Sequence, residues 1–243
     1  MVSKPSKHGW KIELVPWDFS SPEHVQRLYE QRIACGWRAE EVPSWIEEAK
    51  KGGKIFYWAL FSDALPEREK LIETHIETYP KESTPLRDTA AEVRLVPRQP
   101  THVEFIPIGH VAVDIHEPEE DVKLGLPATG TVWIHQLYIS RALHGGGYGA
   151  GTMSKIEMLA AQEPMNAKRV ALDTLTKELQ TDPKTRDILY GEGGNPAPLV
   201  SNEIWYVGQG YEVFNRAEGA YEWSPKPGIT MPMNVVYMRK PLV

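Results

Sequence analysis

The sequence has a single cysteine, no long apolar run and no excess of basic residues, and each absence excludes a class of protein. Cys35 alone excludes an internal disulfide framework and any zinc site built from several cysteines. No apolar run approaches the roughly 20 residues that span a membrane, and no apolar signal-peptide core follows Met1. We therefore expect a cytoplasmic protein with no membrane partner.

Basic charge and metal-type side chains give no functional signal either. The formal net charge of −6 argues against nucleic acid as a partner. The 8 histidines form no His-x-x-x-His pair or similar ligand pair, so no metal site is predicted. A chain of 243 residues with this ordinary globular composition is long enough to bury a sizeable core.

Hydrophobic patterning predicts a mixed α/β fold. Ser21 and Pro22 supply a helix start and Gly36 a helix stop, around apolar residues at helical spacing. The aromatic and apolar run Lys54–Phe61 predicts a buried strand. Strands are predicted over residues 10–15, 54–61, 103–116, 131–140, 169–175, 211–216 and 234–242. Helices are predicted over 43–51, 66–78, 147–163 and 201–209, in addition to the helix that starts at Ser20-Ser21-Pro22-Glu23 and stops at Gly36.

Three segments are predicted to lie outside this pattern. Residues 64–101 are rich in charge and proline and have too few apolar residues for a core. Beyond the helix at 66–78 we interpret them as a long surface insertion in a single domain that spans residues 1–243. Residues 117–130 are acidic, residues 191–198 are rich in glycine, asparagine and proline, and both are predicted to be loops.

The most informative stretch is the junction between the strand at 131–140 and the helix at 147–163. The apolar run Leu137-Tyr138-Ile139 leads through a basic loop into His144-Gly145-Gly146-Gly147-Tyr148-Gly149-Ala150. Glycines leave backbone N–H groups unobstructed and a helix start adds positive dipole, so the junction suits a diphosphate. No lysine follows the glycines as in a Walker loop. The spacing Gly145-x-Gly147-x-x-Ala150, with Asp173 ending the next strand, also fits a relaxed dinucleotide-binding pattern.

This junction resembles the acyl-CoA loop of the GNAT superfamily of N-acetyltransferases, where an apolar strand is followed by Arg/Gln-x-x-Gly-x-Gly/Ala. Gly147 and Gly149 match the glycine positions of that pattern, and His144 stands at the Arg/Gln position. Further along the chain, Trp205–Tyr211 resembles the family's helix that ends in Tyr-x-x-x-Gly-Phe, with tyrosine in place of the phenylalanine. The segment Tyr237–Leu242 resembles the family's closing strand.

The resemblance implies a fold and a co-substrate. We expect a GNAT-type mixed, largely antiparallel sheet flanked by helices, with a splayed central strand pair, and acetyl-CoA as the acyl donor. N–H groups of the glycine loop would hold the CoA diphosphate, and one N–H of the preceding strand would polarise the thioester carbonyl while that strand pairs with pantetheine. The predicted CoA-binding residues are Leu137, Tyr138, Ile139, His144, Gly145, Gly146, Gly147, Tyr148, Gly149 and Ala150.

Four residues are candidates for the proton transfers: Tyr206 as the acid, and His135, Asp173 and, as the third candidate base, Glu104. Tyr206 matches the family tyrosine that protonates the departing thiolate, and its alternative role is a tyrosine packed in the core. His135 is the first candidate for the general base, because a regular strand would place it on the face of Leu137 and Ile139. Its alternative is a histidine hydrogen-bonded within the sheet. Asp173 is the second candidate, with the capping of a loop as its alternative. A path through ordered water needs no dedicated base.

These motifs together predict an N-acetyltransferase that moves an acetyl group directly from acetyl-CoA to a primary amine. A small-molecule amine is the first acceptor class and a protein N-terminus or lysine the second, for a monomer or a homodimer. Two other functions stay open. One is an NAD(P)-dependent oxidoreductase that uses the Gly145–Ala150 loop. The other is a non-catalytic acyl-CoA-binding protein, which would fit the departures from the family pattern at His144 and at Leu199, where the family often has asparagine.

Overall fold

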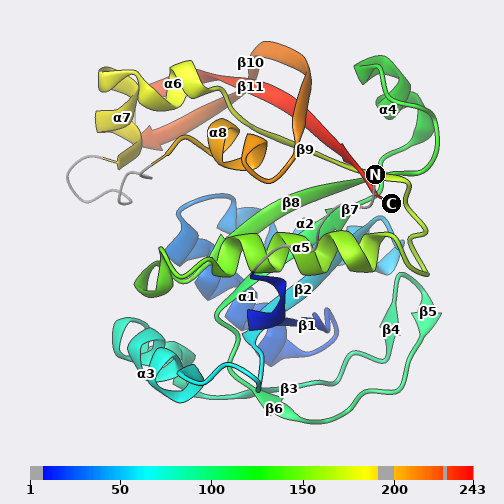
Figure 1. Ribbon diagram of the computed structural model, residues 1–243, viewed down its shortest axis with the longest axis vertical. Coiled ribbons are helices and arrows are strands. Elements are labelled where there is room, and N and C mark those ends of the chain that lie inside the picture. Colours follow the sequence, from blue (N-terminus) through cyan, green and yellow to red (C-terminus); the bar gives the residue numbers. More distant parts are fainter. Residues whose placement is uncertain (1–7, 191–199, 227–228, 243) are drawn as a thin grey trace. The chain divides into compact units, whose positions relative to one another are not determined.

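The computed structural model describes residues 8–190, 200–226 and 229–242 (Figure 1). These residues separate into two units. The first unit holds the described residues among 1–116, 132–168 and 242–243, and the second holds those among 117–131 and 169–241. The prediction of a single domain over 1–243 stays a prediction. Within the described ranges, no helix is both long and apolar enough to cross a membrane.

The first unit is built on four strands that pair antiparallel in the order β1-β2-β7-β8. The bounds are β1 (Ile12–Pro16), β2 (Lys54–Phe61), β7 (Gly109–Asp114) and β8 (Thr131–Ile139). The helices are α1 (Pro22–Cys35), α2 (Val42–Lys50), α3 (Arg68–Thr78) and α5 (Tyr148–Ala160), with single turns η1 (Gly9–Lys11), η2 (Ala39–Glu41), η3 (Pro80–Ser83) and η4 (Arg141–Leu143). Two small ribbons pair β3 (Leu86–Arg87) with β6 (Glu104–Phe105), and β4 (Glu92–Val93) with β5 (Val96–Pro97).

Local signals fix the ends of α1 as predicted. The Ser21 hydroxyl accepts a hydrogen bond from the His24 N–H at 3.4 Å, and Pro22 occupies the first turn, where its missing N–H costs nothing. Gly36 ends the helix with φ of 84°, a left-handed conformation that glycine adopts without steric penalty. The strand at Lys54–Phe61 also has the predicted bounds and is buried along its whole length.

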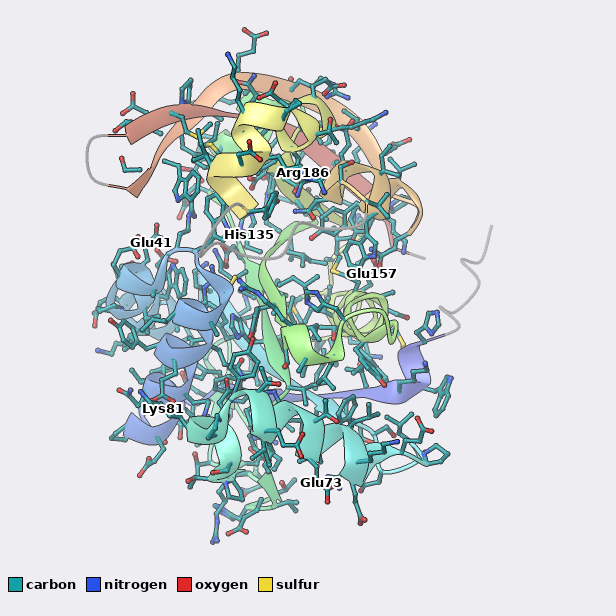
Figure 2. All side chains as sticks on the ribbon, turned by 90° about the vertical axis from the view of Figure 1, so that its left-hand side faces the viewer. Glu41, Glu73, Lys81, His135, Glu157 and Arg186 are labelled. Atoms are coloured by element: carbon teal, nitrogen blue, oxygen red, sulfur yellow. The ribbon has the colours of Figure 1, made fainter. Side chains whose placement is uncertain are left out.

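Helices cover both faces of this sheet (Figures 1 and 2). On one face, Leu28 of α1 and Trp45 of α2 share a buried cluster with Trp58 of β2. On the other face, Tyr148 at the start of α5 packs edge-on against Phe61, with ring centroids 4.8 Å apart. Each large apolar side chain removed from water contributes roughly 1.5–3 kcal/mol. The cluster on this second face also contains Ile139, so it packs the end of β8 against the start of α5.

The pairing of β7 with β8 contains a bulge. His110 pairs with Tyr138, but Ala112 pairs with His135, so β8 carries one more residue than β7 between these pairs. Gln136 lies in the bulge with φ of 46°, a left-handed conformation that usually calls for glycine. An extra residue reverses the alternation of side chains along a strand. The side chain of His135 therefore shares the face of Tyr138.

The insertion at residues 64–101 begins with the predicted helix. The remainder, predicted as a long surface loop, contains η3, β3, β4 and β5 and buries the side chains of Glu82 and Asp88. His75 of α3 is hydrogen-bonded through Nδ1 to the Ser140 hydroxyl at 2.9 Å. The Gln31 amide of α1 donates to the Glu82 carboxylate at 2.6 Å, and both side chains are buried. Polar groups thus tie the insertion to the body of the first unit, which a search for apolar periodicity does not detect.

A buried carboxylate organises the end of the insertion. Asp88 accepts hydrogen bonds from both terminal nitrogens of Arg98, at 2.6 and 2.9 Å, and from the N–H and hydroxyl of Thr101, at 2.9 and 2.7 Å. Burial alone raises the pKa of Asp88, but these bonds reverse that effect and lower the pKa to about 2. The ionised side chain of Asp88 thereby holds together the segment between Leu86 and Glu104.

The second unit contains three strands that pair antiparallel in the order β9-β11-β10. They are β9 (Arg169–Leu175), β10 (Glu212–Lys226) and β11 (Ile229–Pro241), and the helices are α4 (Pro118–Leu124), α6 (Lys177–Thr181), α7 (Pro183–Tyr190) and α8 (Asn202–Val207). The bounds of β9 are as predicted, whereas β10 and β11 are longer than predicted. The predicted loop at 191–198 lies outside the described residues.

The prediction that residues 117–130 form only a loop is wrong, because α4 lies within them. Pro118 stands in its first turn, followed by three acidic residues, and Gly125 ends it with φ of 89°. Negative charge at a helix start and glycine at its end are both favourable. The acidic residues therefore belong to the first turn of a helix, and this helix was not predicted because it lacks an apolar stripe.

Candidate active site

The glycine-rich junction forms a tight turn between β8 and α5. Gly145 and Gly147 have φ of 89° and 79°, and Gly147 is the N-cap of α5. A side chain at Gly146 would lie 2.2 Å from the Tyr148 ring, and one at Gly147 would lie 2.8 Å from the His8 ring. A Cβ atom added at Gly145 would have no neighbouring atom within 4 Å. Backbone conformation therefore favours glycine at positions 145 and 147, and close packing favours it at positions 146 and 147, whereas the space beside Gly145 is open.

The start of α5 presents backbone N–H groups. The helical hydrogen-bond ladder begins with the Gly151 N–H, which donates to the Gly147 carbonyl at 2.9 Å. The N–H groups of Tyr148, Gly149 and Ala150 precede that ladder and carry the positive end of the helix dipole. This is the local geometry that the sequence predicted for a diphosphate site.

A lysine that the sequence analysis did not single out adds positive charge at this turn. The Lys11 ammonium donates to the Gly146 carbonyl at 3.0 Å and lies 5.6 Å from the centre of the Tyr148 ring. Lys11 belongs to η1, more than a hundred residues from the glycines, so no local spacing reveals the contact. The pairing of β1 next to β2, with α5 packed on them, brings it there.

His144 is held against the strand that precedes it. Its Nε2 donates to the Ile139 carbonyl at 3.1 Å, while its side chain stays exposed. The Ser140 N–H donates to the Ile108 carbonyl, on the β7 side, at 2.8 Å. Successive residues of a strand direct their amides to opposite edges. The backbone amide of Ile139 therefore points to the edge of β8 away from β7, on the same edge as its carbonyl and His144.

His135 lies on β8 (Figure 2), but on a different face from the one predicted. The prediction that it shares a face with Leu137 and Ile139 is wrong, because the bulge at Gln136 reverses the alternation. Instead, His135 lies on the α1 and α2 face, where its Nδ1 donates to Asp114 Oδ2 at 2.6 Å.

Asp114 connects His135 to a buried lysine. The Lys54 ammonium donates to both oxygens of Asp114 at 2.6 Å, and its side chain is only 3% exposed. Burial by itself raises the pKa of Asp114, but the hydrogen bond from His135 and the charge of Lys54 outweigh it and lower the pKa to about 2. The carboxylate is therefore ionised throughout the neutral range. Lys54 and Asp114 are direct cross-strand partners, and His135 lies diagonally beside Asp114.

Tyr206 and Asp173 belong to the second unit. Tyr206 is half-buried near the end of α8, with its ring 5.6 Å from that of Tyr211, and Gly210 turns the chain into β10 with φ of 90°. Burial, with a contribution from the negative charge of Asp173, raises the pKa of the Tyr206 phenol. The two predicted proton-transfer residues of this unit are thus electrostatically coupled, and Tyr206 stays protonated at neutral pH.

Leu199 and Asp173 are two further residues named in the sequence predictions. Leu199 lies outside the described residues. Asp173 lies within β9, opposite Tyr237 of β11, rather than at the strand end. Among the described residues, no group of three or more histidine, cysteine, aspartate or glutamate side chains is arranged to hold a metal ion.

Comparison with known proteins identifies the fold. No family model and no curated protein matches the sequence. The structure of Arabidopsis thaliana NAA60 in complex with acetyl-CoA aligns with a TM-score of 0.52 at 12% identity, covering 95% of this chain and 98% of that one. A putative acetyltransferase of the GNAT family from Desulfovibrio desulfuricans aligns with a TM-score of 0.51 at 10% identity, covering 96% and 99%.

A third similar structure is the acetyl transferase from Salmonella typhimurium that modifies the N-terminal serine of ribosomal protein L7/L12. It aligns with a TM-score of 0.50 at 10% identity, covering 99% of this chain and 98% of that one. The chain therefore has the fold of the GNAT acetyltransferases, a mixed α/β architecture of mostly antiparallel strands flanked by helices, as predicted.

Proposed function

We propose that this protein is an acetyl-CoA-dependent N-acetyltransferase that moves the acetyl group directly to a primary amine. One observation carries the proposal: a bulged strand, β8, leads into a glycine turn that starts a helix, within the fold of known acetyltransferases. Bulges and left-handed non-glycine residues cluster at functional sites. The structure of NAA60 in complex with acetyl-CoA supports the same donor here.

Three groups of the first unit would bind the donor. The N–H groups of Tyr148, Gly149 and Ala150 suit a diphosphate, and Lys11 adds a fixed positive charge beside them. The Ile139 amide, directed away from β7, is in the position expected of a donor to the thioester carbonyl. We propose that pantetheine pairs along this edge of β8.

The chemical roles follow from proton balance. His135 would accept a proton from the acceptor amine, whose nitrogen then bonds to the acetyl carbon while the carbon–sulfur bond breaks. Tyr206 would donate its phenolic proton to the leaving thiolate and recover one from solvent. Its raised pKa keeps the phenol protonated before each turnover. The negative charge of Asp173 would then help to keep Tyr206 protonated. Alternatively, Asp173 would itself act as the general base.

We propose a small-molecule primary amine as the first acceptor class and a cytoplasmic site of action. A protein N-terminus or lysine is the second candidate class. The N-terminus is supported by the similar structure from Salmonella typhimurium, which is that of an enzyme that modifies an N-terminal serine. A panel of small amines and short peptides with free N-termini, assayed for release of free CoA thiol, separates the two. Faster turnover of peptides than of every small amine would overturn the first choice.

The class of co-substrate is tested by thermal-shift titration with acetyl-CoA, CoA, NAD and NADP. A ligand that binds only the folded state stabilises it by about 2.7 kcal/mol at a hundred times its Kd. Acetyl-CoA and CoA should raise the melting temperature, and NAD and NADP should not. Stabilisation by NADP without stabilisation by CoA would instead support an oxidoreductase. Stabilisation by CoA without transfer to any acceptor would support a non-catalytic acyl-CoA-binding protein.

A further inference from the structure

A row of three ionisable side chains crosses three strands on the α1 and α2 face of the first unit. Lys54 on β2, Asp114 on β7 and His135 on β8 form consecutive contacts of 2.6 Å. Strand pairing places them there: Lys54 and Asp114 are opposite each other, and the bulge at Gln136 brings His135 to the same face. None of these contacts follows from sequence spacing.

The row is enclosed and fixed at each step. Lys54 lies 5.5 and 5.6 Å from the centres of the Trp45 and Phe56 rings, which shield it from water. Its ammonium also donates to the Gln136 side-chain oxygen at 3.3 Å. A buried charge of this kind is costly unless it is paired and hydrogen-bonded. The pairing of Lys54 with Asp114 meets that cost and holds the carboxylate in one orientation.

The orientation of the carboxylate determines the protonation of the imidazole. Asp114 is ionised and accepts from His135 Nδ1, so the neutral ring carries its proton on Nδ1 and its lone pair on Nε2. A carboxylate behind one ring nitrogen also stabilises the imidazolium that forms when the other nitrogen accepts a proton. The side chain of His135 is only 18% exposed, which limits the solvent that would otherwise weaken this effect.

We propose that Asp114, held by Lys54, is a positioning residue that sets the tautomer and the basicity of His135, so that Nε2 accepts the proton of the acceptor amine. This inference rests on the proposed function for its catalytic consequence, but the tautomer can be measured without activity. The sequence motifs include neither Asp114 nor Lys54.

Two further titratable side chains lie beside this row, His116 next to His135 and Glu48 next to Lys54. The His116 ring lies with its centroid 6.0 Å from that of His135 and stacks on Trp133. Glu48 of α2 lies 3.7 Å from Lys54 and is half exposed. Asp114, at 2.6 Å, is hydrogen-bonded directly to the imidazole.

The test combines NMR with pH profiles. Nitrogen-15 NMR of the histidine side chains should show His135 as the Nδ1–H tautomer in the wild-type protein and lose that preference in Asp114→Asn. In kcat/KM, Asp114→Asn should cost roughly 10- to 10³-fold and move the acidic limb to lower pH by about one unit, because a negative charge is lost. Lys54→Met, which removes a positive charge, should move the limb to higher pH.

Opposite shifts in the two variants support the proposal, since a purely structural loss would lower activity without moving the limb. Asp88→Asn is the matched control, because it removes another buried, paired carboxylate of the same unit. If Lys54→Met does not fold, the double variant Asp114→Asn/Lys54→Met removes both charges and should show the lost tautomer preference. An Nε2–H tautomer in the wild type, or unmoved limbs in both variants, would overturn the proposal. Failure of the proposed function is seen separately, as absence of acetyl transfer by the wild type.

Discussion

At the scale of single residues, the features that matter most are those that break a local rule. Gln136 adopts a left-handed conformation where glycine is usual, and this one residue decides which face His135 occupies. The sequence identified His135 as a candidate base but predicted the wrong face for it, because a glutamine at position 136 gives no sign of a bulge. No sequence motif includes Lys11, Lys54 or Asp114. Their contacts depend on strand register, so the sequence did not identify them.

Tyr206→Phe tests the assigned general acid. Removing only the hydroxyl should lower kcat by roughly 10²- to 10⁴-fold, the usual contribution of a positioned acid or base. The affinity for acetyl-CoA, measured by calorimetry, should change little, because the ring and its packing against Tyr211 remain. An active enzyme whose kcat is unaffected by the substitution would show that another group protonates the thiolate.

Lys11→Gln tests the missed cation. Loss of the ammonium beside the glycine turn should weaken CoA binding by roughly 5- to 30-fold, equivalent to about 1–2 kcal/mol for a charge-assisted contact. The remaining affinity should depend less on salt concentration. Lys81→Gln, at an exposed lysine of η3 (Figure 2), is the control and should leave binding unchanged. Equal affinities for the two variants would remove Lys11 from the site.

At the scale of secondary-structure elements, the sequence predicted those with signals at their own ends. The helix after Ser21 and the strands Lys54–Phe61 and Arg169–Leu175 have caps or continuous apolar runs, and their bounds agree closely with prediction. Helix α4 was missed because it is short and polar, without an apolar stripe. The ordered structure within residues 64–101 could not be predicted, because buried polar side chains hold this segment in place and apolar residues at regular spacing do not.

The clamp at Asp88 predicts an acid-dependent stability. Its folded pKa of about 2 lies below the roughly 3.9 of an unfolded aspartate. The stabilisation is therefore present above about pH 4 and is lost as pH falls through 2. Urea unfolding should show that the wild type loses about 2 kcal/mol more than Asp88→Asn between about pH 5 and pH 2. Asp114 has a similar pKa, so some acid sensitivity should persist in Asp88→Asn.

Parallel loss of stability in the wild type and in Asp88→Asn over that range would show that Asp88 is not the group that titrates. The control is Glu104→Gln, which alters an exposed carboxylate paired with Arg87 at the edge of the same insertion. An exposed pair of this kind contributes little, so its acid profile should match that of the wild type.

At the scale of the whole molecule, two short motifs in the right order were enough to predict the fold. The glycine turn and the tyrosine helix are each only moderately specific, yet the chain aligns along almost its full length with acetyltransferase structures at 10–12% identity. Such likeness fixes the architecture and not the acceptor. The acceptor depends on side chains that differ between proteins of one fold, so it could not be predicted from the motifs.

The central claim is that the protein transfers an acetyl group from acetyl-CoA to an amine. The most direct measurement incubates the purified protein with acetyl-CoA and a panel of primary amines, and follows both free thiol and acetylated amine by mass spectrometry. We predict that thiol and acetylated amine appear in equal amounts, only with amine present, and far more slowly with Tyr206→Phe. Tight binding of CoA with no acetylated product from any small amine or peptide would contradict the account.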